Sequence, residues 1–263
     1  MAAHGSRRAD GHAVSSVSPF RREWADSRFR GAGHAGWNDF HMMAWTYHDA
    51  DSVPIFQHYR KARRPTHDDP RMKRYGYRYP EDPTGRVSLS DGWVWRKPPV
   101  ADAILYRLPI VLRQPDRTLV LTEGERDCLE FVGRGILASC HHGGAGKLTQ
   151  EQARSLAEHR GDIVLVADHD AAGALDVTHR YMHLRKVGIK CHRLTIVLPA
   201  TGPGTDARDH FEEGFGLDDF EVVSFDDVRE VVNGNASALE DAGYFGLTPD
   251  EAAQLKDWKP VPS

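Results

Sequence analysis

The stretch RTLVLTEGERD (residues 117–127) is paired with a second stretch, IVLVADHDAAG (residues 163–173), and the two share one design. Each begins with a short run of aliphatic and β-branched side chains and ends in a cluster of acids. Runs this short and this apolar are typical of strands in a parallel sheet that is covered on both faces. A helical pattern follows each run, so the sequence predicts βα units and an α/β fold.

The acids of both stretches are predicted to converge. Parallel strands end at the same edge of a sheet, which brings Glu123 close to Asp168 and Asp170. Several carboxylates at one edge cannot all stay ionised and unpaired, so a bound divalent cation is expected. Oxygen ligands suit Mg²⁺ or Mn²⁺, with Glu123 as a further ligand or as a general acid or base and Asp127 in support. The alternative, that these acids only favour helix N-termini, explains Glu125 and Asp170 but not the whole set.

The two acidic motifs, in this order and spacing, resemble the Toprim domain of DnaG-type primases, topoisomerases, small ribonuclease-like maturases and OLD-type nucleases. Residues 105–109 (LYRLP) and 143–147 (GGAGK) are similar to segments of the primase-like Toprim proteins of phages and mobile elements. The resemblance covers about residues 45–215. It implies a Toprim fold, with a mostly parallel sheet flanked by helices, preceded by a small antiparallel β region.

The resemblance also implies a function. It is that of a metal-dependent nucleotidyltransferase of DNA replication, which makes RNA primers on single-stranded DNA from nucleoside triphosphates. Four residues match the acidic motif and are the candidate catalytic residues: Glu123, Asp127, Asp168 and Asp170. A further acid of the motif lies in the following loop, where Asp206 or Asp209 is the match for an additional metal ligand. A Toprim nuclease that hydrolyses phosphodiesters and a non-catalytic nucleic-acid-binding subunit are the alternatives.

One departure from DnaG-type primases concerns template recognition. Those primases carry an N-terminal zinc-binding module, whereas the three cysteines here (Cys128, Cys140 and Cys191) show no CxxC spacing. A separate zinc-binding or helicase subunit is therefore an expected partner. Topoisomerase action is not expected, because no separate domain with an active-site tyrosine is present.

The region before the acidic motifs is basic and rich in aromatic residues. Short alternating segments at residues 45–48, 55–59, 75–79 and 93–95 predict strands, the first two forming a hairpin. Basic side chains interleaved with Tyr75, Tyr77 and Tyr79 favour single-strand binding, and the alternative is a solvated charged face. The candidate nucleic-acid contacts are Arg60, Lys61, Arg63, Arg64, Lys73, Arg74 and Arg78. In the GGAGK turn, Lys147 is expected to touch a phosphate, unless the segment is a plain turn.

Composition and charge complete the predicted organisation. Residues 58–97 hold eleven Lys/Arg and five Asp/Glu, whereas residues 206–257 hold fifteen acids and three bases. We expect an N-terminal extension, partly disordered, at 1–44, a basic β-rich region at 45–112, a Toprim core at 113–222 and an acidic helical segment at 223–263. No apolar run approaches membrane-spanning length, and an odd number of scattered cysteines indicates a reducing, cytoplasmic setting. His141, His142 and His169 are expected to face solvent, and Cys128 and Cys140 to be packed in the core.

Overall fold

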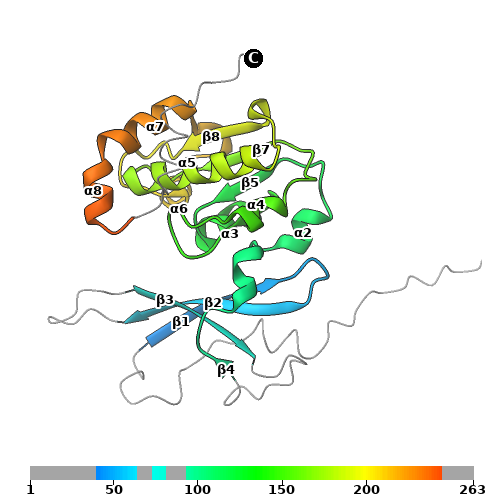
Figure 1. Ribbon diagram of the computed structural model, residues 1–263. Coiled ribbons are helices and arrows are strands. Elements are labelled where there is room, and N and C mark those ends of the chain that lie inside the picture. Colours follow the sequence, from blue (N-terminus) through cyan, green and yellow to red (C-terminus); the bar gives the residue numbers. More distant parts are fainter. Residues whose placement is uncertain (1–39, 64–72, 81–92, 245–263) are drawn as a thin grey trace, which may run out of the picture.

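The computed structural model describes residues 40–63, 73–80 and 93–244, which form two sheets. The first is antiparallel, in the order β1-β2-β3-β4, and lies beneath an α/β unit in Figure 1. The predicted hairpin across residues 49–52 is confirmed by the pairing of β1 with β2. The strand bounds are β1 Phe40–His48, β2 Pro54–Arg63, β3 Lys73–Pro80 and β4 Trp93–Val94. The predicted extension at 1–44 lies mostly outside the described residues.

The second sheet has the order β6-β5-β7-β8-β9. Strands β6, β5, β7 and β8 are parallel, and β9 runs antiparallel to β8, so the predicted mostly parallel α/β sheet is confirmed. The strand β9 had not been predicted, because Glu221–Val223 is short and largely exposed and follows an acidic stretch. The other bounds are β5 Leu119–Thr122, β6 Ala138–Cys140, β7 Ile163–Val166 and β8 Leu194–Leu198.

Helices connect the strands of the second sheet and continue beyond it. The α-helices are α2 Leu108–Leu112, α3 Glu125–Gly133, α4 Gln150–Arg154, α5 Ala171–Lys186, α6 Ala207–Glu212, α7 Phe225–Gly234 and α8 Ala236–Asp241. Short 3-10 helices are η1 Pro99–Ala103, η2 Cys191–Arg193 and η3 Leu217–Asp219. Helix α4 is short, since Thr149 caps its start and turns follow Arg154. The end of the predicted acidic helical segment, from residue 245 on, lies outside the described residues.

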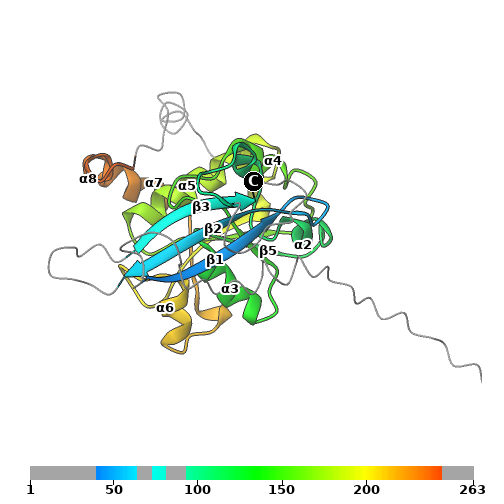
Figure 2. The ribbon, with the colours of Figure 1, turned by 90° about the horizontal axis from the view of Figure 1, so that it is seen from below.

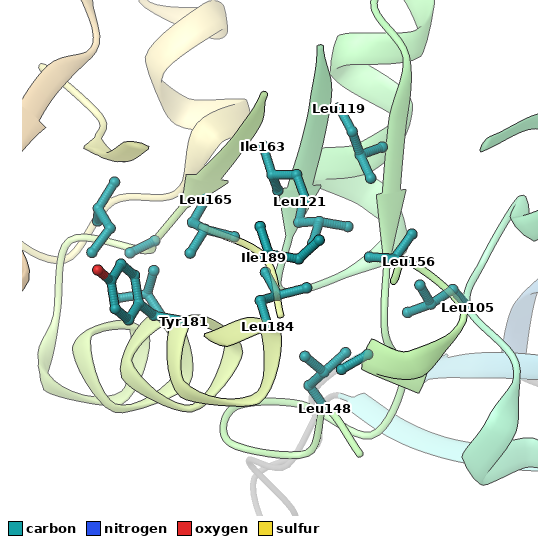
Figure 3. Close-up of a cluster of buried hydrophobic side chains, with 14 of the residues drawn as sticks. Leu105, Leu119, Leu121, Leu148, Leu156, Ile163, Leu165, Tyr181, Leu184 and Ile189 are labelled. Carbon is teal, nitrogen blue, oxygen red and sulfur yellow. The ribbon is translucent and has the colours of Figure 1, made fainter. Parts of the chain in front are cut away.

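The apolar strands are covered on both faces, as their composition predicts. In β5, Leu119 and Leu121 belong to one core cluster while Val120 between them belongs to another. The cluster of Leu119 includes the buried face of α5, seen in Figure 3, and the cluster of Val120 includes residues of α3 and α6. Side chains that alternate between two buried faces favour apolar residues at successive positions, which explains the apolar run Leu119–Leu121.

The antiparallel sheet shares a core with the α/β unit. The buried cluster that includes Leu119 and Leu121 of β5 also includes Leu105 and, from the antiparallel sheet, Trp45, Tyr47 and Phe56. Seen from below in Figure 2, β1, β2 and β3 lie across the α/β unit. The sheet therefore closes off the end of the unit where the acidic motifs lie. None of the described helices is long and apolar enough to cross a membrane.

Candidate active site

A cavity of about 420 Å³ lies between the two sheets, and acids form one of its walls. Glu123 follows β5, Asp127 lies in the first turn of α3, and Asp168 follows β7. Asp206, at the N-terminus of α6, also lines the cavity. The predicted convergence of Glu123 and Asp168 at one edge of the sheet matches this arrangement.

The acids of this wall hold protons more strongly than free carboxylic acids do. Burial, together with the charge of Asp176, raises the pKa of Glu123 to about 7. Burial and the charge of Asp206 raise the pKa of Asp127 to about 7, and one oxygen of Asp127 is buried without a hydrogen-bond partner. Burial and the charge of Glu123 raise the pKa of Asp168 to about 9. Each shift has the sign expected of carboxylates crowded together without a compensating cation.

The donor set suits a hard divalent cation. Among the described residues, no three side chains of His, Cys, Asp or Glu are grouped closely enough to enclose a metal ion. Mg²⁺ does not require such a cage, because it usually keeps several waters and binds one or two carboxylates together with substrate phosphates. The orphaned oxygen of Asp127 and the raised pKa values of Glu123 and Asp168 therefore fit Mg²⁺ or Mn²⁺.

Two predicted acids occupy other positions. Asp170 is exposed and caps α5, its side chain accepting a hydrogen bond from the Gly173 amide at 2.7 Å. Asp209 occupies the third position of α6, where its carboxylate accepts from the Asp206 amide at 3.1 Å. Of the two loop acids, Asp206 is thus the one that reaches the cavity, while Asp170 follows the helix-cap alternative.

The opposite wall of the cavity is aromatic and comes from the antiparallel sheet. Trp45, His58, Tyr75 and Tyr77 line it, on β1, β2 and β3. Tyr75 stacks on His58 with ring centroids 5.5 Å apart, and it is 55% exposed. An acidic wall that faces an aromatic wall offers ligands for a metal-bound phosphate on one side and ring faces for a base on the other.

Glu125 joins the two walls, although its position in the EGE motif predicted only a helix N-terminal charge. Its Oε1 lies 2.5 Å from Nδ1 of His58 and accepts a hydrogen bond from the hydroxyl of Tyr47 at 2.8 Å. Burial alone would raise the pKa of Glu125, but the hydrogen bonds from His58 and Tyr47 hold it below its usual value. The sequence carries no local signal for this contact, because its partners lie 67 and 78 residues away.

The sequence analysis also did not predict a buried ionic cluster behind the acidic wall. On α5, Asp176 lies 2.7 Å from Nε of Arg180 and 3.0 Å from Nε2 of His141. The Arg180 guanidinium also donates to the carbonyl oxygens of Leu121, at 2.6 Å, and Val166, at 2.8 Å. Arg180 therefore binds the ends of β5 and β7, just before Glu123 and Asp168 in the sequence. The only signal in the sequence was an Asp and an Arg four residues apart in a predicted helix.

The histidines beside the site differ from their prediction. His141 and His142 are buried rather than facing solvent, and His169 is half-buried. Asp176 outweighs the effect of burial and raises the pKa of His141, whereas burial lowers the pKa of His142 to about 4. These histidines follow the end of β6, where the antiparallel sheet covers them. Cys128 and Cys140 are fully buried, as predicted.

The predicted basic patch falls partly on β2 and β3. In the register of these strands, Arg60 pairs with Tyr75 and Lys61 with Arg74. Arg78 is a correction: it is fully buried, donates to Gln57 at 2.7 Å and lies 4.3 Å from the Trp93 ring, so it is not a surface contact. Two further candidates, Arg63 and Lys73, lie at strand ends, and Arg64 lies outside the described residues.

Lys147 lies in a turn with glycines at positive φ, and its side chain is exposed. It lines a second cavity of about 480 Å³, together with Lys97 and His183. This cavity shares Tyr77, His142 and Gly143 with the first. The expected phosphate contact of Lys147 stays a prediction, now located beside the acidic site rather than within it.

Comparisons with known proteins give one family model that matches part of the α/β unit and solved structures that match most of the chain. A family model described as Toprim-like matches residues 120–209, and no curated protein matches the chain. Similar solved structures include the DnaG catalytic core, at 14% identity and a TM-score of 0.46, covering 91% of this chain and 70% of that one. Others are the DnaG primase catalytic domain bound to ssDNA (13%, TM-score 0.47, 83% and 62%) and the Aquifex aeolicus primase with its zinc-binding and RNA polymerase domains (16%, 0.44, 90% and 55%).

The match to the family model spans both acidic motifs, from β5 to Asp209 in α6. Within it, the order of strands and helices and the convergence of Glu123, Asp127 and Asp168 agree with the resemblance that the sequence motifs suggest. Residues 120–209 of this chain form a Toprim-like domain.

Proposed function

We propose that the chain is a metal-dependent nucleotidyltransferase of DNA replication, which synthesises RNA primers on single-stranded DNA from nucleoside triphosphates. The observation that carries the proposal is the single cavity in which Glu123, Asp127, Asp168 and Asp206 face the aromatic wall of the antiparallel sheet. Acids alone would serve many reactions on phosphates. Acids opposite aromatic rings suit a substrate that has both phosphates and bases.

In this mechanism, Glu123 and Asp168 would hold Mg²⁺ or Mn²⁺, with Asp127 and Asp206 as further ligands or as acceptors from water. A bound cation would neutralise charge that develops on the oxygens of the transferred phosphoryl group. The aromatic wall orients the base of the nucleotide or template, and Arg180 keeps the ends of β5 and β7 in place. Partial burial of the acids lowers the local dielectric and strengthens each electrostatic contact.

The test uses purified protein, oligo(dT), labelled ATP and Mg²⁺ or Mn²⁺. An RNA primer annealed to the template removes dependence on a separate zinc-binding or helicase subunit at initiation. Asp168→Asn should abolish synthesis. The control is Asp116→Asn, which removes an exposed carboxylate paired with Arg160 before the start of β5, at the opposite end of the strand from Glu123. We expect extended products with the wild type and the control only.

Other outcomes would replace the proposal. Shortened oligo(dT) that disappears in Asp168→Asn would identify a nuclease built on the same acids. Binding of oligo(dT) without any product, unchanged in Asp168→Asn, would identify a non-catalytic nucleic-acid-binding subunit.

A further inference from the structure

His58 is held in one orientation inside the cavity. It comes from β2, on the sheet opposite the acids, and its side chain is 3% exposed. Its Nδ1 lies 2.5 Å from Oε1 of Glu125, and its ring stacks against Tyr75 and contacts Tyr77 at 4.9 Å between centroids. With one edge fixed by a carboxylate and the ring faces packed, the imidazole cannot rotate without breaking these contacts.

The other ring nitrogen of His58 lacks a partner. Nε2 is buried and makes no hydrogen bond with any of the described residues. The same residue lines the cavity that Glu123, Asp127 and Asp168 line. Buried polar groups in folded proteins are nearly always paired, so a polar atom left unpaired beside a candidate active site indicates that a ligand or water completes it.

The contact with Glu125 determines what Nε2 offers to a ligand. A carboxylate oxygen accepts hydrogen bonds, and Oε1 of Glu125 accepts one from the Tyr47 hydroxyl at 2.8 Å and lies 2.5 Å from Nδ1 of His58. Nδ1 of His58 must therefore carry a proton. In the neutral imidazole this leaves a lone pair on Nε2, which makes that atom a hydrogen-bond acceptor.

We propose that His58 contacts the substrate through Nε2, which accepts a hydrogen bond from a sugar hydroxyl, and that Glu125 is the positioning residue that fixes the required tautomer. The inference rests on the proposed function, since it names the group that the nucleotidyltransferase site recognises on the wall opposite the acids. The hydroxyl belongs either to the incoming nucleotide or to the 3′ end of the growing strand.

The first measurement is the ¹⁵N NMR spectrum of ring-labelled histidines in the full chain, with His58 assigned by its loss in His58→Phe. We expect Nδ1 protonated and Nε2 unprotonated in the free protein. With Mg²⁺, a shift of Nε2 on adding ATP but not 2′,3′-dideoxy-ATP places the hydroxyl on the nucleotide. A shift with a primed oligo(dT) but not with a 3′-deoxy primer places it on the growing strand. A protonated Nε2 in the free protein, or no shift with either ligand, overturns the inference.

The second measurement is primer extension by variants. His58→Phe keeps an aromatic ring of similar size and should lower kcat/KM about tenfold or more, the effect of losing one hydrogen bond to the reacting substrate. Glu125→Gln can donate to Nδ1, which allows the wrong tautomer, and should shift the Nε2 resonance as well as lower kcat/KM. The control is His159→Phe, the same substitution of a buried histidine outside the cavity. Full activity in folded His58→Phe would overturn the inference.

Extension and NMR separate this inference from the proposed function. Synthesis without any change at Nε2 overturns the inference alone. A change at Nε2 that depends on a hydroxyl, without synthesis, supports the inference and overturns the proposed reaction. If there is no synthesis and no change at Nε2, both the inference and the proposed function are overturned.

Discussion

Single residues in the acidic motifs are constrained by backbone as much as by chemistry. A Cβ on Gly173 would lie 2.2 Å from the carbonyl oxygen of Asp168 and 2.7 Å from its amide nitrogen. The glycine of the DHDAAG stretch therefore allows the first turn of α5 to pack against the residue that carries the candidate metal ligand. The requirement is one of space, because no positive φ is involved.

We predict that Gly173→Ala displaces the Asp168 backbone and lowers the free energy of unfolding by about 1–3 kcal/mol or more. Gly133→Ala is the matched control, since a Cβ there meets nothing within 4 Å, and it should be neutral or slightly stabilising. Urea denaturation of the three proteins measures both. Equal stability of Gly173→Ala and the wild type would contradict the close contact.

His142 should make stability depend on pH. Its Nε2 donates to the Ala101 carbonyl and its Nδ1 accepts from Tyr77, so the buried ring is neutral. Burial lowers its pKa to about 4, against 6.5 in an unfolded chain. As pH falls below 6.5, the unfolded chain takes up a proton that the folded chain refuses until about pH 4, so stability is lost across this window.

We predict that His142→Gln loses less stability than the wild type between pH 7 and pH 5, by about 2 kcal/mol, because glutamine does not titrate. Glutamine can still donate to Ala101, which limits the cost of the substitution at pH 7. Urea unfolding at both pH values gives the difference. Parallel pH profiles for the two proteins would show that His142 is protonated in the fold.

Helix α5 positions the site through its buried charges. Helix α5 carries both Asp176 and Arg180, and the Arg180 side chain hydrogen-bonds to the ends of β5 and β7. Because the two strands precede Glu123 and Asp168, the spacing between the acidic motifs depends on this helix. A buried ion pair is costly to break from one side, since the remaining charge stays buried without its partner.

We predict that Arg180→Met lowers the free energy of unfolding by about 3–5 kcal/mol, because Asp176 is left buried with His141 and the Gly146 amide but without its guanidinium partner. Arg154→Met removes an exposed pair with Glu151 in α4 and should change it by less than about 1 kcal/mol. Chemical denaturation followed by circular dichroism compares them. Similar small losses in both variants would show that the buried cluster is dispensable for stability.

In the molecule as a whole, one hydrophobic cluster extends across both sheets. Tyr47 and Phe56 of the antiparallel sheet stack with centroids 4.5 Å apart and belong to the cluster that includes Leu105 and Leu119. The predicted boundary between residues 112 and 113 therefore separates parts of one hydrophobic cluster. Two regions that share a core are expected to unfold together.

We predict that Phe56→Ala destabilises the whole chain by about 3–5 kcal/mol in a single transition, as expected for a large buried side chain. Far-ultraviolet circular dichroism reports both sheets, and the tryptophans among the described residues, Trp45, Trp93 and Trp95, lie in or directly beside the antiparallel one. The circular dichroism and the tryptophan fluorescence should shift together. If the fluorescence transition moves and the helical signal does not, the sheets are independent domains.

The sequence by itself determined the α/β unit and half of its site. Continuous apolar strands and the acids directly after them are local features of the sequence. Because the strands of a parallel sheet end at one edge, the sequence alone predicted that Glu123 and Asp168 lie together at that edge. The helix caps were also local, which is why Asp170 carried an alternative that the structure follows. What the sequence could not decide is which loop acid reaches the cavity.

Only the tertiary structure decided what covers the acids. The contacts of Glu125 with His58 and Tyr47 join residues far apart in sequence, and no periodicity encodes how one sheet docks on another. The same docking buries His142 and places Tyr75 opposite the acids, while the packing of Trp93 buries Arg78. Strand register depends on pairing between segments, so the pairing of Arg60 with Tyr75 appears only once β2 and β3 are aligned.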